Sequence, residues 1–389
     1  MERGAMRFVA IRRDIHQHPE TAYEEVRTAA IVTDTLRAAG IEVVTGLAET
    51  GIVGILRAGS GKRAIGLRAD MDALNMEEGN VFAHRSSHAG KMHACGHDGH
   101  TATLLAAATY LAETRRFDGT VYFVFQPAEE ADGGARRMIE DGLFDRFPME
   151  AIFGLHNMPG IPVGSFAVRP GAMMAGVDEF EIHIEGVGGH AAMPHLASDP
   201  LVTTGALIQA LQTIVARNVD PMRNAVLSLT RVNGGSASNV LPGEVELAGT
   251  VRYFDADIQA LVEQRIAEVA HHVARAHGCL ATLRYGRLFP PTINAPAETK
   301  LCAGVLRDLV GAERVDTNPQ PVMASEDFAF MLQAKPGCYI WLGNGDGDGG
   351  CGVHNPHYDF NDRAIPFGAA YWVRLVETAL PPAELQDAS

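Results

Sequence analysis

The sequence predicts an α/β protein in which a central, at least partly parallel sheet is interrupted by a smaller inserted unit. Strands and helices alternate through the first third of the chain, as they do where helices cover a parallel sheet. Between residues 175 and 288 the order changes to β-α-β-β-α-β, the ferredoxin-like pattern. After Pro290 the α/β character returns. We therefore expect one larger domain from residues 1–174 and 289–389, with residues 175–288 inserted.

The first third supplies a buried sheet and its helices. Residues 21–40 have a helical pattern that Gly40 closes, and residues 100–114 predict a second helix. The run VYFVF at 121–125 is β-branched and aromatic throughout, which suits a strand covered on both faces. Further strands are predicted at 52–56, 64–69 and 151–156, and a further helix at 133–144.

The inserted segment has the alternation of a half-exposed sheet. EFEIHIE at 179–185 alternates polar and apolar side chains with the period of a strand that has one solvated face. Long apolar-periodic segments at 199–219 and 257–278 predict two helices. The remaining strands of the unit are predicted at 225–232, 245–254 and 279–286.

Length, charge and cysteine content restrict the class of protein. A chain of 389 residues is too long for one comfortable core, so two domains are expected. The formal net charge of -15 argues against nucleic-acid binding, because phosphate affinity requires a basic surface. We expect no signal peptide and no membrane span. Five thinly scattered cysteines do not suggest a disulfide framework, which favours a cytoplasmic protein with reduced thiols.

Candidate metal ligands occur in four widely separated places. Cys95 and His97 lie in MHACGHDGH, directly before a predicted helix. The other candidates lie at the carboxyl end of a predicted strand or in the loop beyond it: the pair Glu129–Glu130, His156 and His354. In open α/β sheets, sites form in the loops beyond the carboxyl ends of the strands. We therefore expect these side chains to converge.

The adjacent carboxylates Glu129 and Glu130 cannot easily point the same way, so one can ligate a cation while the other acts as a base. Together the candidates supply one thiolate, three imidazoles and one carboxylate. That is more ligands than a structural zinc site uses, and it suits a site for two cations. Thiolate and imidazole favour zinc or a later transition metal over calcium and magnesium. Upstream, Asp70 and Asp72 could orient a ligand histidine or be ordinary loop aspartates.

Several long motifs resemble the aminoacylase and hippurate hydrolase branch of metallopeptidase family M20. That branch includes hippurate hydrolases, N-acyl-amino-acid amidohydrolases and auxin-conjugate hydrolases. The resemblance runs in the same order through almost the whole chain. Its motifs are RRDIHQHPE (12–20), MHACGHDGH (92–100), FQPAEE (125–130), GLHN (154–157), GGHAAMPH (188–195), SEDFAFML (325–332) and VHNPHYDFND (353–362).

The resemblance implies two divalent ions (zinc, manganese, cobalt or nickel) and a general base at Glu129. We also count Asp72, a possible orienting residue from its position after a strand, among the catalytic residues. The resemblance implies a histidine, His190, that reaches into the site, often of the partner subunit. Asn239 and Arg252 match positions that hold a substrate carboxylate. The family fold is a metal-binding domain with an α+β insert that dimerises and closes over the site, so a homodimer or homotetramer is expected. The implied metal ligands are Cys95, His97, Glu130, His156 and His354.

We therefore expect hydrolysis of the amide that joins an acyl group to an amino acid. The same scaffold could instead serve a dipeptidase or an aminopeptidase. A different class, a non-enzymatic metal or thiol-redox protein using Cys95, also stays open. Glu129 counts against that class, because metal binding alone requires no spare carboxylate.

Overall fold

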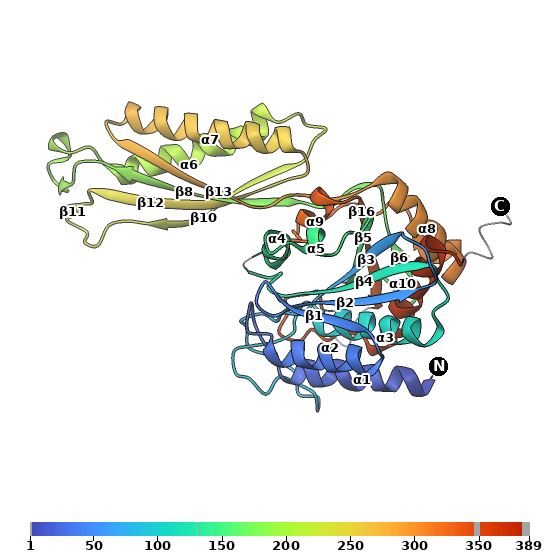
Figure 1. The fold of residues 1–389 in the computed structure, drawn as a ribbon. Coiled ribbons are helices and arrows are strands. Elements are labelled where there is room, and N and C mark those ends of the chain that lie inside the picture. Colours follow the sequence, from blue (N-terminus) through green and yellow to red (C-terminus); the bar gives the residue numbers. More distant parts are fainter. Residues whose placement is uncertain (1, 132, 346–350, 383–389) are drawn as a thin grey trace. The chain divides into compact units, whose positions relative to one another are not determined.

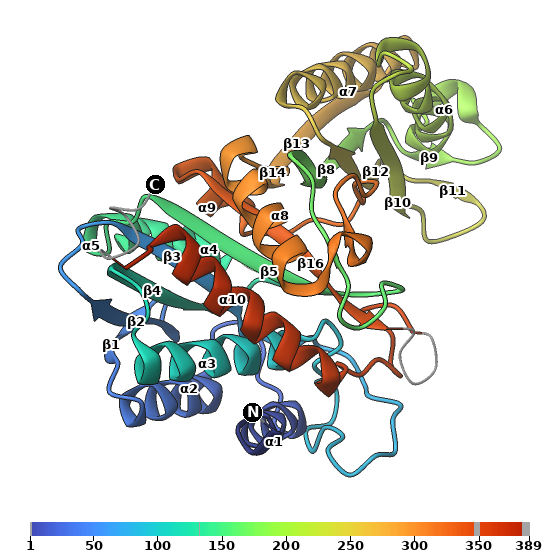
Figure 2. The same cartoon turned by 90° about the vertical axis from the view of Figure 1, so that its right-hand side faces the viewer.

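The computed structural model describes residues 2–131, 133–345 and 351–382. The chain divides into two compact units, which Figures 1 and 2 show as ribbons coloured along the sequence. The larger unit comprises the residues up to Met173, Thr292–Gln320 and the residues from Asp327 onwards. The smaller unit comprises Met174–Pro291 and Pro321–Glu326.

The larger unit is built on an eight-stranded mixed sheet, which confirms the predicted α/β class. Its strand order is β1-β2-β4-β3-β5-β16-β6-β15, and the central strands β4, β3, β5 and β16 are mutually parallel. The carboxyl ends of these four strands therefore meet at one edge. The strands are β1 (Glu42–Leu47), β2 (Gly51–Ala58), β3 (Ala64–Asp70), β4 (Gly119–Gln126), β5 (Ala151–Pro159), β6 (Phe166–Ala167), β15 (Val315–Asp316) and β16 (Gly337–Gly345).

Helices cover both faces of this sheet. Helix α3 (His97–Thr114) contacts α1 (Glu2–Gln17), α2 (Val26–Ala38) and α10 (Ile365–Ala379) on one face, and α8 (Pro296–Val310) contacts α10. The other helices of the unit are α4 (Gly134–Glu140), α5 (Leu143–Arg146) and α9 (Ala329–Ala334). Side chains such as Leu104, Phe123 and Trp372 are fully buried between the sheet and these helices. None of the described helices is long and apolar enough to cross a membrane.

The smaller unit has the β-α-β-β-α-β order that the sequence predicts. Its antiparallel sheet has the order β10-β12-β8-β13, and α6 and α7 pack on one face (Figure 1). The elements are β8 (Gly176–Glu185), α6 (Pro200–Asn218), β10 (Ala225–Asn233), β12 (Glu244–Tyr253), α7 (Ala256–Ala276) and β13 (Leu280–Phe289). Two short pairs complete the topology, β9 (Gly189–His190) with β11 (Val240–Leu241), and β7 (Gly171–Met174) with β14 (Thr292–Asn294).

One segment of the smaller unit has no counterpart in the predicted domain boundaries. Residues 321–326, expected within the larger domain, belong to the smaller unit. Val322 forms a parallel bridge with Met174, and the backbone N–H of Ala175 donates to the carbonyls of Val322 and Ala324. A segment this short has no hydrophobic period, so its position depends on backbone hydrogen bonds that the sequence does not reveal.

Asp178 anchors the core of the smaller unit. Its carboxylate is buried and accepts hydrogen bonds from Tyr253 (3.1 Å), Gln259 (2.8 Å) and Tyr285 (2.8 Å). Asp178→Ala would leave these donors without their acceptor, so we expect about 2–4 kcal/mol lower free energy of unfolding for this unit. Denaturant unfolding of the variant measures the change, and a loss below about 0.5 kcal/mol would contradict the assignment.

Candidate metal centre and active site

The five candidate ligands all lie in the larger unit, at the carboxyl edge of its parallel strands. Cys95 precedes α3, and His97 is the first residue of that helix. Glu130 follows β4, His156 lies near the end of β5, and His354 follows β16. The parallel direction of the strands brings together residues up to 259 positions apart (354 minus 95).

Within this edge the candidate ligand atoms form two overlapping groups. Cys95, His97 and His156 make one group, and Cys95, Glu130 and His354 make the other. In each group the ligand atoms lie within 4.8 Å of one another. Cys95 Sγ is 3.3 Å from His156 Nε2, and Glu130 Oε1 is 3.2 Å from His354 Nε2. Two groups that share a thiol have the donor arrangement of a dinuclear centre.

Two buried polar atoms at this centre support metal binding. Among the described residues, His97 Nε2 has no hydrogen-bond partner, and Glu130 Oε1, 3.8 Å away, has only its ion pair with His354. Buried polar atoms are nearly always satisfied, so such a pair points to a bound ion. His97 Nδ1 contacts Asp72, and His156 Nδ1 contacts the carbonyl of Asn157. Both contacts leave the Nε2 lone pairs available for ligation.

The electrostatics of the centre also suit cations. Burial lowers the pKa of His97, but the carboxylates of Asp70 and Asp72 overcome this effect and raise it to about 10. Burial, together with Glu130 and Glu129, raises the pKa of the Cys95 thiol well above its ordinary value. A reactive redox cysteine requires a lowered pKa. The protein environment therefore disfavours a redox thiolate, whereas a bound cation would stabilise the thiolate as a ligand.

Asp72 lies behind the centre and orients two of its residues. It is almost fully buried, and Oδ1 lies 3.2 Å from His97 Nδ1. Its Oδ2 accepts the backbone N–H of Glu130 at 2.9 Å. The structure thus favours the orienting interpretation of Asp72 over that of an ordinary loop aspartate.

Asp72→Ala is expected to weaken metal binding by about 10–100-fold, because His97 and the Glu130 loop lose their common anchor. Competition against a metal indicator measures the change in affinity. Asp145→Ala, at an exposed position of the same unit, is the matched control. Unchanged affinity in the Asp72 variant would contradict the orienting role.

A buried hydrogen-bond chain joins Asp70, a candidate orienting residue, to Asn157 and Tyr358, whose supporting roles the sequence analysis did not identify. His100 Nδ1 contacts Asp70 at 2.6 Å, and His100 Nε2 accepts the backbone N–H of Asn157 at 2.9 Å. The Asn157 amide donates to the carbonyl of Cys95 at 2.6 Å and accepts the hydroxyl of Tyr358. The chain fixes the backbone around Cys95. The only sequence signal for Asn157 was its place in the GLHN motif.

His93, in the motif MHACGHDGH, lies in the loop before α3. Its side chain is buried, and burial lowers its pKa to about 4. It is therefore a neutral core residue.

Glu129 lies beside the candidate ligands and is distinct from them. It is 7% exposed, and a carboxylate oxygen lies within 4.8 Å of ligand atoms of His97 and Glu130. Its Oε1 accepts the backbone N–H of Asp327 at 3.3 Å. Glu130 instead faces His354 and His97. Both carboxylates thus lie near His97, whereas their other contacts differ: the N–H of Asp327 for Glu129 and His354 for Glu130.

The three remaining candidates, His190, Asn239 and Arg252, lie in the smaller unit. His190 and Asn239 are exposed neighbours, because the backbone N–H of Ala191 donates to the carbonyl of Asn239 at 3.1 Å. Arg252 is half-buried on β12, where Nη1 donates to Ser325 Oγ at 3.2 Å. The structure therefore groups His190 with Asn239 and separates both from Arg252.

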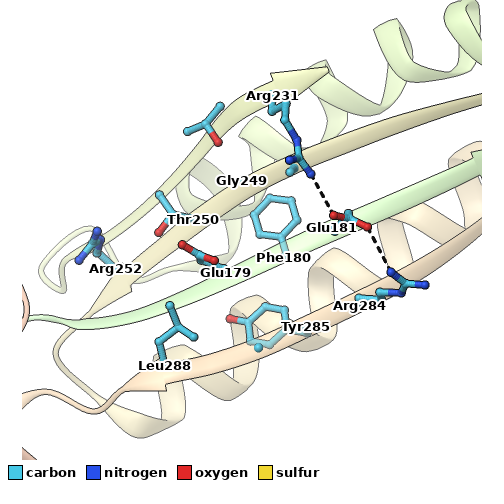
Figure 3. A pocket seen from close by; sticks show the side chains of 13 residues that line it. Glu179, Phe180, Glu181, Arg231, Gly249, Thr250, Arg252, Arg284, Tyr285 and Leu288 are labelled. Atoms are coloured by element: carbon cyan, nitrogen blue, oxygen red, sulfur yellow. Dashed lines mark hydrogen bonds and ion pairs between the residues drawn. The ribbon is translucent and has the colours of Figure 1, made fainter. Parts of the chain in front are cut away.

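Arg252 borders a hollow of about 650 Å³ on the open face of the four-stranded sheet (Figure 3). Glu179 and Thr250 lie beside it, whereas Glu181 further along the hollow pairs with Arg231 at 3.0 Å and Arg284 at 3.5 Å. Among the described residues, Arg252 forms no ion pair. Burial lowers its pKa, with Glu179 acting in the opposite direction. A guanidinium of this kind is suited to an anionic partner from outside the chain.

Comparison with known proteins decides the family. The model of peptidase family M20/M25/M40 matches residues 66–378. This chain belongs to that family. It is 40% identical over 368 residues to hippurate hydrolase of Campylobacter jejuni, with 95% of both chains covered. It is 41% identical over 360 residues to N-acetyl-L-cysteine deacetylase of Bacillus subtilis, with 92% of this chain and 84% of the relative covered.

Two solved structures support the fold of the chain. A putative aminohydrolase from methicillin-resistant Staphylococcus aureus matches with a TM-score of 0.90 at 32% identity and covers 97% of both chains. The YXEP protein of Bacillus subtilis, described as a dinuclear metal binding peptidase of the M20 family, matches with a TM-score of 0.86 at 32% identity. That match covers 98% of this chain and 99% of the other. The predicted M20 resemblance and fold class are confirmed.

Proposed function

We propose that this M20 chain is a metal-dependent amidohydrolase that cleaves the amide bond of N-acyl-L-amino acids. The observation that carries the proposal is the pair of overlapping ligand groups that share Cys95, with the buried carboxylate of Glu129 beside them. The relatives named for hippurate hydrolysis and N-acetylcysteine deacetylation support this substrate class.

The ligand set is Cys95, His97, Glu130, His156 and His354. Two divalent cations, when bound, would supply Lewis-acid activation of water and of the scissile carbonyl. Thiolate and imidazole donors favour zinc, and manganese, cobalt and nickel are alternatives. The carboxylate-rich surroundings of His97 favour a doubly charged ion over an empty centre.

Glu129 acts as the general base and acid of the reaction. Its carboxylate accepts a proton from the attacking water and later delivers that proton to the leaving amine. The backbone N–H of Asp327 donates to Oε1 of Glu129 and thereby restrains this carboxylate. The amino acid leaves with a neutral amine. Glu129 gives up the same proton that it accepted from water, so the carboxylate ends the reaction ionised, as it began.

Arg252, with Asn239 from a second copy, binds the free carboxylate of the amino-acid half, and His190 stabilises the developing oxyanion. The half-buried guanidinium of Arg252, which has a hydroxyl partner and no described ion pair, supports this role. A bound carboxylate would complete its hydrogen bonding. Arg252 thereby selects substrates with a free carboxylate.

The positions of Arg252 and His190 in the smaller unit support a homodimer or a homotetramer. We also propose that the protein is cytoplasmic. Arg252 pairs with Val177 at one end of β8, whereas the opposite end of β12, at Glu244, pairs with Glu185. His190 lies beyond that second end, paired with Val240 of β11. At about 3.3 Å per residue, the two side chains of one copy are roughly 25–30 Å apart. One small substrate therefore requires His190 from a second copy.

A chelate-and-reconstitute assay tests the proposed function. We expect chelation to abolish hydrolysis of N-benzoyl- and N-acetyl-amino acids, and zinc, manganese, cobalt or nickel to restore it at two ions per chain. Free dipeptides assayed in parallel identify a peptidase, which would require the free amino terminus. Full activity after metal removal would contradict the proposal.

A further inference from the structure

The segment Ser325–Asp327 connects the two units, and its last residue anchors the loop that carries the general base. The buried carboxylate of Asp327 accepts the amide of Gln126 at 2.8 Å and the backbone N–H of Ala135 at 2.9 Å. Gln126 ends β4, and Ala135 lies in α4. Asp327 therefore holds the end of β4 and the start of α4, the two elements between which Glu129 and Glu130 lie in the sequence.

Asp327 also contacts the general base directly. Its backbone N–H donates to Glu129 Oε1 at 3.3 Å. Arg68 donates to the Asp327 carboxylate at 3.2 Å and to Asp70 at 2.7 Å, and all three side chains are buried. The position of this N–H is thus fixed by a buried ionic network.

Ser325, two residues earlier, contacts the arginine that we assign to the substrate carboxylate. Its Oγ accepts a hydrogen bond from Arg252 Nη1 at 3.2 Å. The N–H of Ala175 donates to the carbonyls of Val322 and Ala324, which fixes the backbone beside Ser325. In Figure 3, Arg252 stands at the end of the hollow, apart from the Glu181 ion pairs. Ser325 is therefore the residue that holds this guanidinium in place.

We propose that Ser325 and Asp327 are positioning residues that couple recognition of the substrate carboxylate to the general base. Ser325 orients Arg252, and Asp327 orients Glu129. Because two peptide units join them, the carboxylate-binding group and the base share one short backbone segment. This inference rests on the proposed function and adds two residues to it.

Ser325→Ala tests the recognition half of the proposal. We expect KM for an N-acyl amino acid to rise about tenfold, the effect of one hydrogen bond to a charged group, with little change in kcat. The ratio of kcat/KM for the N-acyl amino acid to kcat/KM for the analogue with a carboxamide in place of the α-carboxylate should fall by the same factor. Ser325→Thr, which keeps the hydroxyl, should restore both. Thr282→Ala removes an exposed hydroxyl of the same unit and is the control.

Asp327→Asn tests the catalytic half. The loop loses its anionic anchor, so we expect kcat to fall at least about tenfold with KM and metal content unchanged. Gln126→Met, which removes the same contact from the other side, should reproduce this loss if Asp327→Asn fails to fold.

Two results would overturn the inference: Ser325→Ala with wild-type selectivity, or Asp327→Asn and Gln126→Met with wild-type kcat. If the wild-type protein did not hydrolyse N-acyl amino acids, or if it kept its activity after chelation, the proposed function would instead be refuted. The two failures are therefore distinguishable.

Discussion

Glu129→Gln is expected to lower kcat by roughly 10²–10⁴-fold, which is the usual contribution of a general base. The glutamine amide keeps the size of the side chain but cannot accept the proton of the attacking water. Neither ligand group requires Glu129, because Cys95, His97, Glu130, His156 and His354 form both groups without it. Steady-state kinetics on an N-acyl amino acid, together with metal analysis, measures the effect.

The matched control is Glu140→Gln, an exposed glutamate on the nearby helix α4. It should retain wild-type turnover. Near-normal kcat in Glu129→Gln with both metals bound would remove Glu129 from the mechanism. Loss of metal from that variant would show that Glu129 is a ligand, which would reverse the division of labour between Glu129 and Glu130.

Mixing two inactive variants is expected to restore activity if His190 serves the site of a second copy. His190→Ala and Arg252→Ala should each lose at least about 100-fold in kcat/KM, because each removes a charge-stabilising or carboxylate-binding group. Random exchange gives mixed dimers in half of the population, and each has one intact site. Coexpression should therefore recover about a quarter of wild-type activity.

The negative control for this experiment combines Arg252→Ala with Glu129→Gln. Both residues are proposed to serve the same copy's site, since Ser325 and Asp327 join them along the chain. This pair should recover no activity. Recovery in the control, or none in the first mixture, would contradict the assignment of His190 to the partner. Light scattering of the wild-type protein gives the oligomeric state independently.

Structural features that depend on residues close together in the chain were predicted correctly from the sequence. The β-branched run at 121–125 lies within β4, and the β-α-β-β-α-β order of the smaller unit is confirmed. These features depend on side-chain period, which is a property of neighbouring residues. The candidate ligands could be identified for a similar reason, since strand ends in a parallel sheet share one edge.

Residues that act through buried contacts could not be predicted in this way. Arg12 is fully buried on α1, a helix for which the sequence analysis made no prediction. It forms an ion pair with Asp98 of α3 at 2.9 Å. Asn157 and Tyr358 support the backbone of Cys95 from positions 62 and 263 residues away. Such contacts join distant segments and leave no periodic signal along the chain.

The sequence by itself determined the fold class, the M20 family and the set of residue types available for two cations. The tertiary structure decided which of these residues face one another: the sharing of Cys95 by two groups, the different partners of Glu129 and Glu130, and the separation of His190 from Arg252. The physical reason is that local sequence patterns specify helices and strands. Hydrogen-bond partners depend instead on strand register and on where the loops between these elements fold back. The smaller unit shows this most clearly, because Arg252 lies in its four-stranded sheet, whereas His190 lies in the separate β9–β11 pair beyond the other end of β12.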